Sequence, residues 1–298
     1  MRVAVVGAAG FLGSAVVAAL TEQGHTVRGL VRSAAQSERI SRLGAAPVRG
    51  DLVSGRGLAE LLEGCEAAVH LAQAAEGDLE DRRRVRVEGG RRLVAAAGTA
   101  GVRRIVIGSG YWVYRSSPEP IVEDSPIDPR SISLVNFETE QVAREAASRE
   151  RFEVVYVRPG MGYGDGSWFG EMVRELRAGT YRHLGDGSNF MSPIHLADAA
   201  SAFGAILERG APGATYLAVD EAPVRVHDFA SFVAGQLGAP APGALDPADA
   251  LREWGEDLVI LESASRRASA ERLRSLGWRA RFPRYVQGVP DVLRRMTA

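Results

Sequence analysis

The chain has 298 residues, 46% hydrophobic and 24% charged, which is enough to bury a large core as one domain or as a domain with a smaller lobe. Its net charge of -1 gives no reason to expect a nucleic-acid partner, and its single cysteine, Cys65, excludes an intramolecular disulfide framework. No apolar stretch approaches a membrane span and a predicted strand follows Met1 directly, so we expect a cytoplasmic protein with no signal peptide and no membrane partner.

The first predicted element is an apolar strand, Val3 to Val6, and it is followed by a glycine-rich turn and a helical pattern. Gly7 allows a tight turn, Gly10 lets backbone N–H groups approach a phosphate, and Gly13 lets the helix lie close to the sheet. A second predicted strand, Thr26 to Val31, follows within one βαβ length. This arrangement predicts a dinucleotide site at the helix N-terminus, with a ligand-free glycine turn as the plainer alternative.

The end of the second predicted strand carries Arg32 and Ser33, and no acidic residue stands there. Enzymes that prefer NAD commonly place a carboxylate at this point, whereas the 2′-phosphate of NADP needs a cation and hydroxyl donors. We therefore predict NADP (NADPH) as the cofactor. In the plainer alternative, Arg32 only faces solvent.

The next two predicted strands, near 46–48 and 67–71, end in further candidate cofactor contacts. Asp51 and Leu52 follow the third strand, where the carboxylate accepts from the adenine amino group and the leucine packs on the ring. His70 ends the fourth strand and is interpreted as a packed histidine rather than a base. The arginine run at 82–86 is interpreted as a solvated helix face rather than a nucleic-acid patch.

Short β-branched runs alternate with longer amphipathic segments through the first half of the chain, and two more strands are predicted near 104–107 and 153–157. Continuous apolar strands that alternate with helices indicate a parallel sheet covered on both faces. The sequence therefore predicts an α/β fold, a Rossmann-type doubly wound parallel sheet. Functional residues should lie at the carboxyl ends of its strands, in the loops at 70–73, 108–111 and 158–163.

The regular alternation decays after about Tyr163, where glycine and proline become frequent. We predict a dinucleotide-binding domain over 1–163, with 191–220 returning to the sheet. Residues 164–190 and 221–298 are assigned to a smaller C-terminal substrate lobe. No metal site is predicted, because His and Asp residues show no metal-ligand spacing.

These features together resemble the extended short-chain dehydrogenase/reductase superfamily, specifically its NAD(P)-dependent epimerase/dehydratase group. The glycine signature at 7–13 matches, as do Val48-Arg-Gly-Asp51-Leu, Val69-His-Leu-Ala72 and Val157-Arg-Pro-Gly160. The resemblance implies a small-molecule substrate and a homodimer paired through helices of the sheet. With the residues above, the predicted cofactor set is Gly7, Gly10, Phe11, Leu12, Gly13, Arg32, Ser33, Asp51, Leu52, Leu71, Ala72, Gln73, Ser109, Pro159 and Gly160.

The resemblance also exposes a departure at the catalytic positions. The superfamily usually uses a Ser or Thr after the fifth strand, with a Tyr and a Lys four residues apart on the next long helix. Here Gly110, Asn136 and Glu140 stand at those positions, and the chain contains no lysine. A glutamate there raises rather than lowers the pKa of a neighbouring phenol, so the standard tyrosine mechanism is disfavoured.

Three residues are predicted to replace the missing catalytic groups. Glu140 is a candidate general acid or base if it faces a partly desolvated pocket, with a solvated or ribose-bonded glutamate as the equal alternative. Tyr111 is a candidate proton donor, or packs with Trp112. Asn136 is a candidate for holding a substrate oxygen.

The predicted function is an NADP-dependent reductase acting on a small carbonyl or sugar-like metabolite with a non-standard proton donor. Two alternatives stay open: a non-redox dehydratase, isomerase or cyclase on the same scaffold, and a non-catalytic NADP-sensing protein. Arg182 is a candidate for meeting an anionic substrate such as a nucleotide diphosphate. His195 is expected to order the start of a helix at Asp198.

Overall fold

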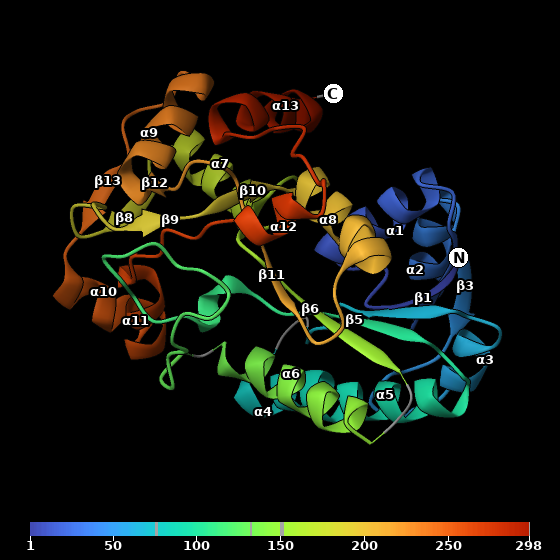
Figure 1. Cartoon of the computed structure of the whole chain (residues 1–298). Helices are drawn as coiled ribbons and strands as arrows, with labels where there is room; N and C mark the ends of the chain where they lie inside the picture. The colour runs from blue at the N-terminus through green and yellow to red at the C-terminus, as the bar shows by residue number, and fades with distance from the viewer. Residues whose placement is uncertain (75–76, 132, 150–151, 298) are drawn as a thin grey trace.

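A seven-stranded sheet forms the centre of the molecule in the computed structural model, which describes residues 1–74, 77–131, 133–149 and 152–297 (Figure 1). Every neighbouring pair of strands is parallel. The strand order is β11 (Thr215–Ala218), β6 (Glu153–Pro159), β5 (Arg104–Gly108), β4 (Ala67–His70), β1 (Arg2–Val6), β2 (Thr26–Val31) and β3 (Ala46–Arg49). The predicted Rossmann-type parallel sheet is therefore confirmed.

Helices cover both faces of this sheet, which explains why its central strands read as continuous apolar runs. Along β1, Val3 and Val5 belong to one buried cluster, whereas Ala4 and Val6 belong to another on the opposite face. The first face carries α1 (Phe11–Glu22), α2 (Ala34–Arg42) and α8 (Leu196–Arg209). The second carries α3 (Leu58–Leu62), α5 (Gly89–Thr99) and α6 (Leu134–Ala147).

Shorter elements connect these layers. The helix α4 (Leu79–Arg83) continues through a π-helical turn, Arg84–Glu88, into α5. A 3-10 turn, Tyr111–Val113, follows β5 and leads toward α6. Both connections pass the carboxyl ends of the central strands, where the candidate site lies.

The predicted strand positions agree with the structure to within about two residues. The last strand of the first half extends to Pro159, two residues beyond its expected end, because β11 continues to pair with it at Ala218. β11 comes from the segment expected to return to the sheet, and it adds the edge strand beside β6.

A second, smaller core lies at one end of the sheet (Figure 1, upper left). It buries Phe169, Val173, Phe229, Val233 and Val289. Its helices are α7 (Trp168–Ala178), α9 (Val226–Leu237) and α13 (Tyr285–Thr297), and its strands are β7 (Met161–Tyr163), β9 (Phe190–Met191), β10 (Pro193–His195) and β12 (Val224–Arg225).

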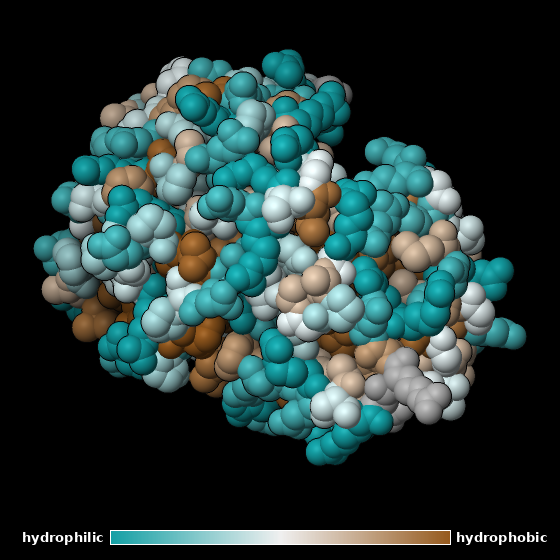
Figure 2. All heavy atoms as spheres, in the orientation of Figure 1, coloured by the Kyte–Doolittle hydropathy of each residue, from teal (hydrophilic) through white to brown (hydrophobic). Residues whose placement is uncertain are grey.

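The remaining elements border this lobe. They are β8 (Arg182–Leu184), β13 (Gly243–Leu245), α10 (Pro247–Trp254), α11 (Glu256–Ser263) and α12 (Glu271–Ser275). Figure 2 shows a mostly hydrophilic face with hydrophobic side chains at its left, over α10 and α11, where Leu251 and Leu258 are exposed. Among the described helices, none has the length and apolar character needed to cross a membrane.

Candidate cofactor and active site

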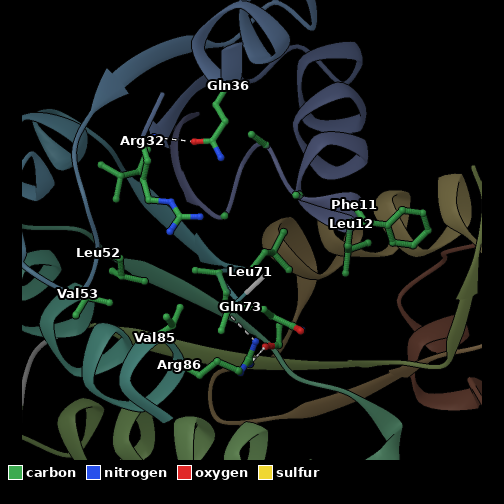
Figure 3. Close-up of a pocket in the computed structure, with 18 of the residues that line it drawn as sticks. Phe11, Leu12, Arg32, Gln36, Leu52, Val53, Leu71, Gln73, Val85 and Arg86 are labelled. Carbon is green, nitrogen blue, oxygen red and sulfur yellow. Dashed lines mark hydrogen bonds between the residues drawn. The ribbon is translucent and has the colours of Figure 1, made fainter. Parts of the chain in front are cut away.

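A cavity with a volume of about 630 Å³ opens at the carboxyl ends of β1 to β5 (Figure 3). This is the edge of the sheet at which the sequence predicts functional residues. Its lining includes Gly7, Gly10, Phe11, Leu12, Gly13, Arg32, Gln36, Asp51, Leu52, Leu71, Ala72, Gln73, Val85, Arg86, Gly108 and Ser109. Twelve of these belong to the predicted cofactor set.

The glycine turn has the geometry that a bound diphosphate requires. Gly7 has a φ of +80°, and a Cβ on Gly13 would lie 1.9 Å from the Gly7 carbonyl oxygen, so neither position accepts a side chain without movement. Gly10 is the N-cap residue of α1 and gives the helix no side-chain cap. The first turn of α1 contains no acidic residue. Its first N–H groups therefore remain available to an anion, and the residues present fit a dinucleotide diphosphate.

The end of β2 brings Arg32 and Gln36 to the cavity. The Arg32 backbone N–H donates to the Gln36 side-chain oxygen at 2.7 Å, and the Arg32 guanidinium extends over the cavity in Figure 3. Ser33 behaves differently, because its hydroxyl accepts from the Gln36 N–H and caps α2. Ser33 is not among the lining residues, whereas Gln36, which the sequence analysis missed, is.

Pro159 and Gly160 also lie outside the cavity lining. The strand β6 runs on to Pro159, and the Gly160 N–H donates to the Ala218 carbonyl at 2.8 Å. Hydrogen bonding to β11 therefore holds this segment in the sheet. The sequence analysis ended the strand two residues too early and so placed both residues in the cofactor loop.

Asp51 lines the cavity just after the end of β3. Its side-chain oxygen accepts the Ser54 N–H at 2.8 Å, and this backbone hydrogen bond is the main reason that its pKa is lowered. The carboxylate is therefore the charged form at neutral pH and remains a hydrogen-bond acceptor toward the cavity.

Arg86 is a further functional candidate that sequence analysis missed. The arginine run was interpreted as a solvated helix face, and Arg82, Arg83 and Arg84 are indeed exposed, but Arg86 is only 2% exposed and lines the cavity. Its guanidinium donates to the Ala72 and Gly108 carbonyls at the ends of β4 and β5. The only signal of burial in the sequence was the position of Arg86 between two valines, because apolar residues are not expected on a solvated helix face.

Burial lowers the pKa of Arg86 to about 10, so the side chain still carries its positive charge at neutral pH. Its Nε has no hydrogen-bond partner among the described residues. A buried guanidinium thus lies at the end of the cavity away from Arg32, with one donor unused.

Ser109 occupies the same end of the cavity. Its backbone N–H donates to the Val157 carbonyl at 2.7 Å, which fixes the residue at the end of β5. The hydroxyl is buried and has no hydrogen-bond partner in the described ranges. A polar group in this state is a candidate for binding a ligand, because an unsatisfied buried hydroxyl costs stability.

Glu140 does not face a pocket as the acid/base hypothesis requires. Its carboxylate is completely buried and receives two hydrogen bonds from Arg158, at 2.9 and 2.6 Å. Arg158 also donates to the Tyr114 hydroxyl at 2.5 Å. Burial lowers the pKa of Arg158, but the hydrogen bonds and charge of Glu140 more than offset this, so the pKa lies above its ordinary value. Glu140 is therefore the partner of a structural ion pair.

The other two catalytic candidates have different surroundings. Tyr111 is 1% exposed, packs against Trp112 with ring centroids 4.6 Å apart, and is not among the cavity-lining residues. Burial raises its pKa above the ordinary value, which opposes proton transfer from it. Asn136 does approach the loop, since its side-chain nitrogen lies 3.6 Å from where a Cβ on Gly110 would stand. Its substrate role stays a prediction.

Two histidines behave as expected. His70 is fully buried, and burial lowers its pKa to about 3, so it is a neutral packed side chain and not a base. His195 precedes α8, and its ring nitrogen accepts from the Ala197 N–H at 3.1 Å, while Asp198 accepts two backbone N–H groups from Arg281 and Phe282. The expected ordering of this helix start is confirmed.

The model of the NAD dependent epimerase/dehydratase family matches residues 3–218. The chain belongs to this family.

Several relatives are named as reductases, and two of them cover more than nine tenths of this chain. A "3-diazoavenalumate denitrifying reductase" from a Streptomyces species is 30% identical, with 97% of this chain and 99% of the relative covered. A "4-hydroxy-2-methyl-3-oxo-4-farnesyl-3,4-dihydroquinoline-1-oxide ketoreductase" from Stigmatella aurantiaca is 29% identical, with 92% and 85% covered. The relatives of this chain therefore include oxidoreductases.

Solved structures share the fold. A human epimerase family protein crystallised with NADPH has a TM-score of 0.82 at 23% identity, covering 99% of both chains. A dTDP-glucose 4,6-dehydratase from Streptomyces venezuelae, with NAD bound, has a TM-score of 0.83 at 23% identity, covering 99% of this chain and 96% of the other. At these identities the likeness establishes the architecture.

Proposed function

We propose that this family member is an NADP-dependent reductase of small-molecule carbonyl compounds. One observation carries the proposal. A single cavity joins a glycine turn, a cation at the end of β2 and, at the end of β5, a hydroxyl that has no hydrogen-bond partner among the described residues. The first two features suit a phosphorylated dinucleotide, and the third suits a carbonyl oxygen.

Each part of the cavity would hold one part of the cofactor. The turn from Gly7 to Gly13 would bind the diphosphate, and Arg32 would bind the 2′-phosphate. Asp51 and Leu52 would contact the adenine, while Leu71, Ala72 and Gln73 would border the nicotinamide half. When bound, NADPH supplies a hydride for the carbonyl carbon.

The chain's own groups then act on the carbonyl oxygen. The Ser109 hydroxyl would donate a hydrogen bond to it, and the nearby positive charge of Arg86 would favour the negative charge that develops there. Glu140 accepts its two hydrogen bonds from Arg158, and its charge opposes the effect of burial on the pKa of Arg86, so Arg86 keeps its positive charge. Water would deliver the proton, at a cost of roughly a hundred- to ten-thousand-fold in rate relative to a positioned acid.

The non-redox alternative has less support. It requires Glu140 or Tyr111 as the acid or base, but Arg158 neutralises Glu140, and Tyr111 does not line the cavity. The NADP-sensing alternative differs from the reductase only in its expected result, because it predicts that the cofactor binds without turnover.

The cofactor half of the proposal is tested by calorimetry with NADPH and NADH. We expect Arg32→Ala to weaken NADPH binding by roughly 10- to 100-fold, the effect of losing a hydrogen bond to a charged group, and to leave NADH binding unchanged. Arg39→Ala is the matched control. Arg39 lies on α2 but outside the cavity lining, so its loss should change neither affinity.

The chemical half is tested by following the absorbance of reduced nicotinamide with a panel of aromatic and aliphatic ketones. Consumption of NADPH with formation of the alcohol supports the reductase. Product formation without cofactor consumption would favour the non-redox alternative, and NADPH binding without any product would favour a sensor. Equal affinity for NADH and NADPH in the unmodified protein would refute the cofactor assignment.

A further inference from the structure

A second cavity of about 290 Å³ lies in the smaller lobe, and aromatic and sulfur side chains dominate its lining. Three of the chain's four tryptophans, Trp112, Trp168 and Trp254, line it together with Met161, Met172 and Met191. Flat indole rings and flexible thioethers pack well against planar apolar molecules. Its size is at the lower end of small-molecule pockets, which begin at roughly 300 Å³.

Neighbouring segments of the chain line this lobe cavity and the cofactor cavity. Trp112 follows Ser109 by one short turn, so the β5 loop contributes to both cavities. On the other side, the Trp168 indole donates to the Gly162 carbonyl at 2.7 Å, and Phe11 of the cofactor cavity lies 3.8 Å from where a Cβ on Gly162 would stand. A molecule in the lobe cavity would therefore lie next to the proposed reaction end.

The charged residues of the lobe cavity are mostly acidic. Glu171, Glu175 and Glu262 line it, against a single arginine, Arg182. That arginine donates to both carboxylate oxygens of Glu253, at 3.3 and 2.6 Å, so its charge is already paired. The contact of Arg182 with a nucleotide diphosphate stays a prediction, and the acidic lining does not favour it, because a polyanion here would meet repulsion.

The histidine in the lining has its ring nitrogens directed at other groups of the protein. One ring nitrogen of His183 lies 3.1 Å from the Gly185 carbonyl, and the other lies 3.0 Å from a ring nitrogen of His227. Both positions of this ring are thus engaged within the protein. The lobe cavity therefore offers apolar surface and carboxylates.

Glu262 is the polar group best placed to select a ligand. It lies near the end of α11, and its carboxylate has no hydrogen bond or ion pair within the described ranges, although its backbone carbonyl accepts from Asn189. Burial raises the pKa of this carboxyl group, with Arg266 opposing the shift. A partly buried acceptor without a donor favours a ligand that brings one.

We propose that the lobe cavity binds an uncharged, flat aromatic ketone and that Glu262 accepts a hydrogen bond from a hydroxyl or N–H group on its ring. This inference rests on the proposed reductase function and names the substrate class for the same site. The aromatic body stacks among the tryptophans, and the acidic lining excludes carboxylated and phosphorylated molecules. The ketone end faces the β5 loop, toward Ser109.

The test compares two probes that differ in charge, 6-acetyl-2-naphthol and 6-acetyl-2-naphthoate, by calorimetry and by tryptophan emission. We expect the naphthol to bind at least about tenfold more tightly than the naphthoate, because only the latter adds an anion beside the acidic lining. Bound naphthol should quench the emission. The quench should persist in Trp278→Phe, since Trp278 donates to Ser201 outside this cavity, and should fall in Trp168→Phe.

The role of Glu262 is tested in Glu262→Gln, with Glu256→Gln as the control on the same helix. Glu256 begins α11 and does not line the cavity. We expect Glu262→Gln to weaken naphthol binding by roughly tenfold or more and to narrow the gap between the two probes. Unchanged circular dichroism in both variants shows that the fold is intact.

The outcomes separate this inference from the proposed function. Naphthoate binding as tight as naphthol binding, or naphthol binding without quenching, would overturn the lobe-cavity assignment even if NADPH binds and is consumed with other ketones. Selective naphthol binding to a protein that fails to bind NADPH would sustain the lobe-cavity assignment and overturn the reductase proposal.

Discussion

The cofactor cavity and the lobe cavity are built in different ways. The first is formed largely by backbone, with a glycine turn whose neighbouring atoms leave no room for a Cβ, and most of its parts come from consecutive βα connections. The second is formed by large side chains from the β5 loop, α7, α9, α10 and α11, which are distant in the sequence. A cavity lined by backbone can bind the same ligand in all members of a fold. A cavity lined by side chains can change its ligand when those side chains are substituted.

A buried ion pair lies next to the loop that follows β5. Glu140 of α6 pairs with Arg158 of β6, and Arg158 also holds Tyr114, at the end of the turn that carries Trp112. The pair thus connects the sheet to a loop that lines both cavities. Predictions about it test whether the two cavities are separable.

The largest effect is expected for Glu140→Gln, which leaves the Arg158 charge buried without its partner. We expect a loss of about 3–5 kcal/mol in the free energy of unfolding, measured by urea denaturation. A general acid or base would instead give a stable protein with an altered pH dependence of rate.

A double substitution distinguishes the ion pair from simple packing. Glu140→Met with Arg158→Met removes both charges, so it should recover most of the stability that either single change loses. If the double variant is as unstable as the sum of the single variants, the charges are not the cause.

The next effect concerns the backbone cavity. In Gly13→Ala the new Cβ would collide with the Gly7 carbonyl, so the turn must shift. We expect a loss of about 1–3 kcal/mol in stability and a much weaker affinity for NADPH, while 6-acetyl-2-naphthol still binds to the lobe cavity. Thermal melts and calorimetry with each ligand measure both quantities.

Gly235→Ala is the control for this substitution. Gly235 lies in α9 with nothing within 4 Å of its Cβ position, so alanine should be neutral or slightly stabilising. Equal loss of naphthol and NADPH binding in Gly13→Ala would show that the two cavities form one cooperative unit.

The contrast between the cavities also explains what sequence could predict. The spacing of Gly7, Gly10 and Gly13 is a local signal, because strand, turn and helix are contiguous, and the parallel sheet follows from the alternation of apolar strands with helices. The cofactor prediction at Arg32 depends on one strand end and needs no distant partner.

The failures at Glu140 and Arg86 share one cause, which is a partner elsewhere in the sequence. No neighbour of Glu140 in the sequence indicates that Arg158 will neutralise it. Likewise, no neighbour of Arg86 in the sequence identifies the Ala72 and Gly108 carbonyls as the acceptors of its hydrogen bonds in the interior. The lobe cavity was equally hidden, since α10 and α11 meet α7 only in the folded chain. A charged residue keeps the same local pattern whether it is solvated or buried with a distant partner.

The smallest expected effect is a pH dependence of stability that arises near the lobe and not in the glycine turn. Asp220 follows β11 near the lobe, and both of its carboxylate oxygens lack a hydrogen-bond partner among the described residues. Burial, together with the charge of Asp198, raises its pKa to about 8. An unfolded aspartate has a pKa near ~3.9, so between about pH 4 and pH 8 the folded state holds one more proton and stability must fall as pH rises.

Asp220→Asn should remove this dependence, because the amide does not titrate. We expect the slope of unfolding free energy against pH, measured by denaturation between pH 6 and 8, to become less negative by up to about 1.4 kcal/mol per pH unit. Asp257→Asn, at an exposed position in α11, should leave the slope unchanged. The glycine turn contains no titratable group, so a slope that persists in Asp220→Asn would move the source of the pH dependence to another buried group, with Asp198 the nearest candidate.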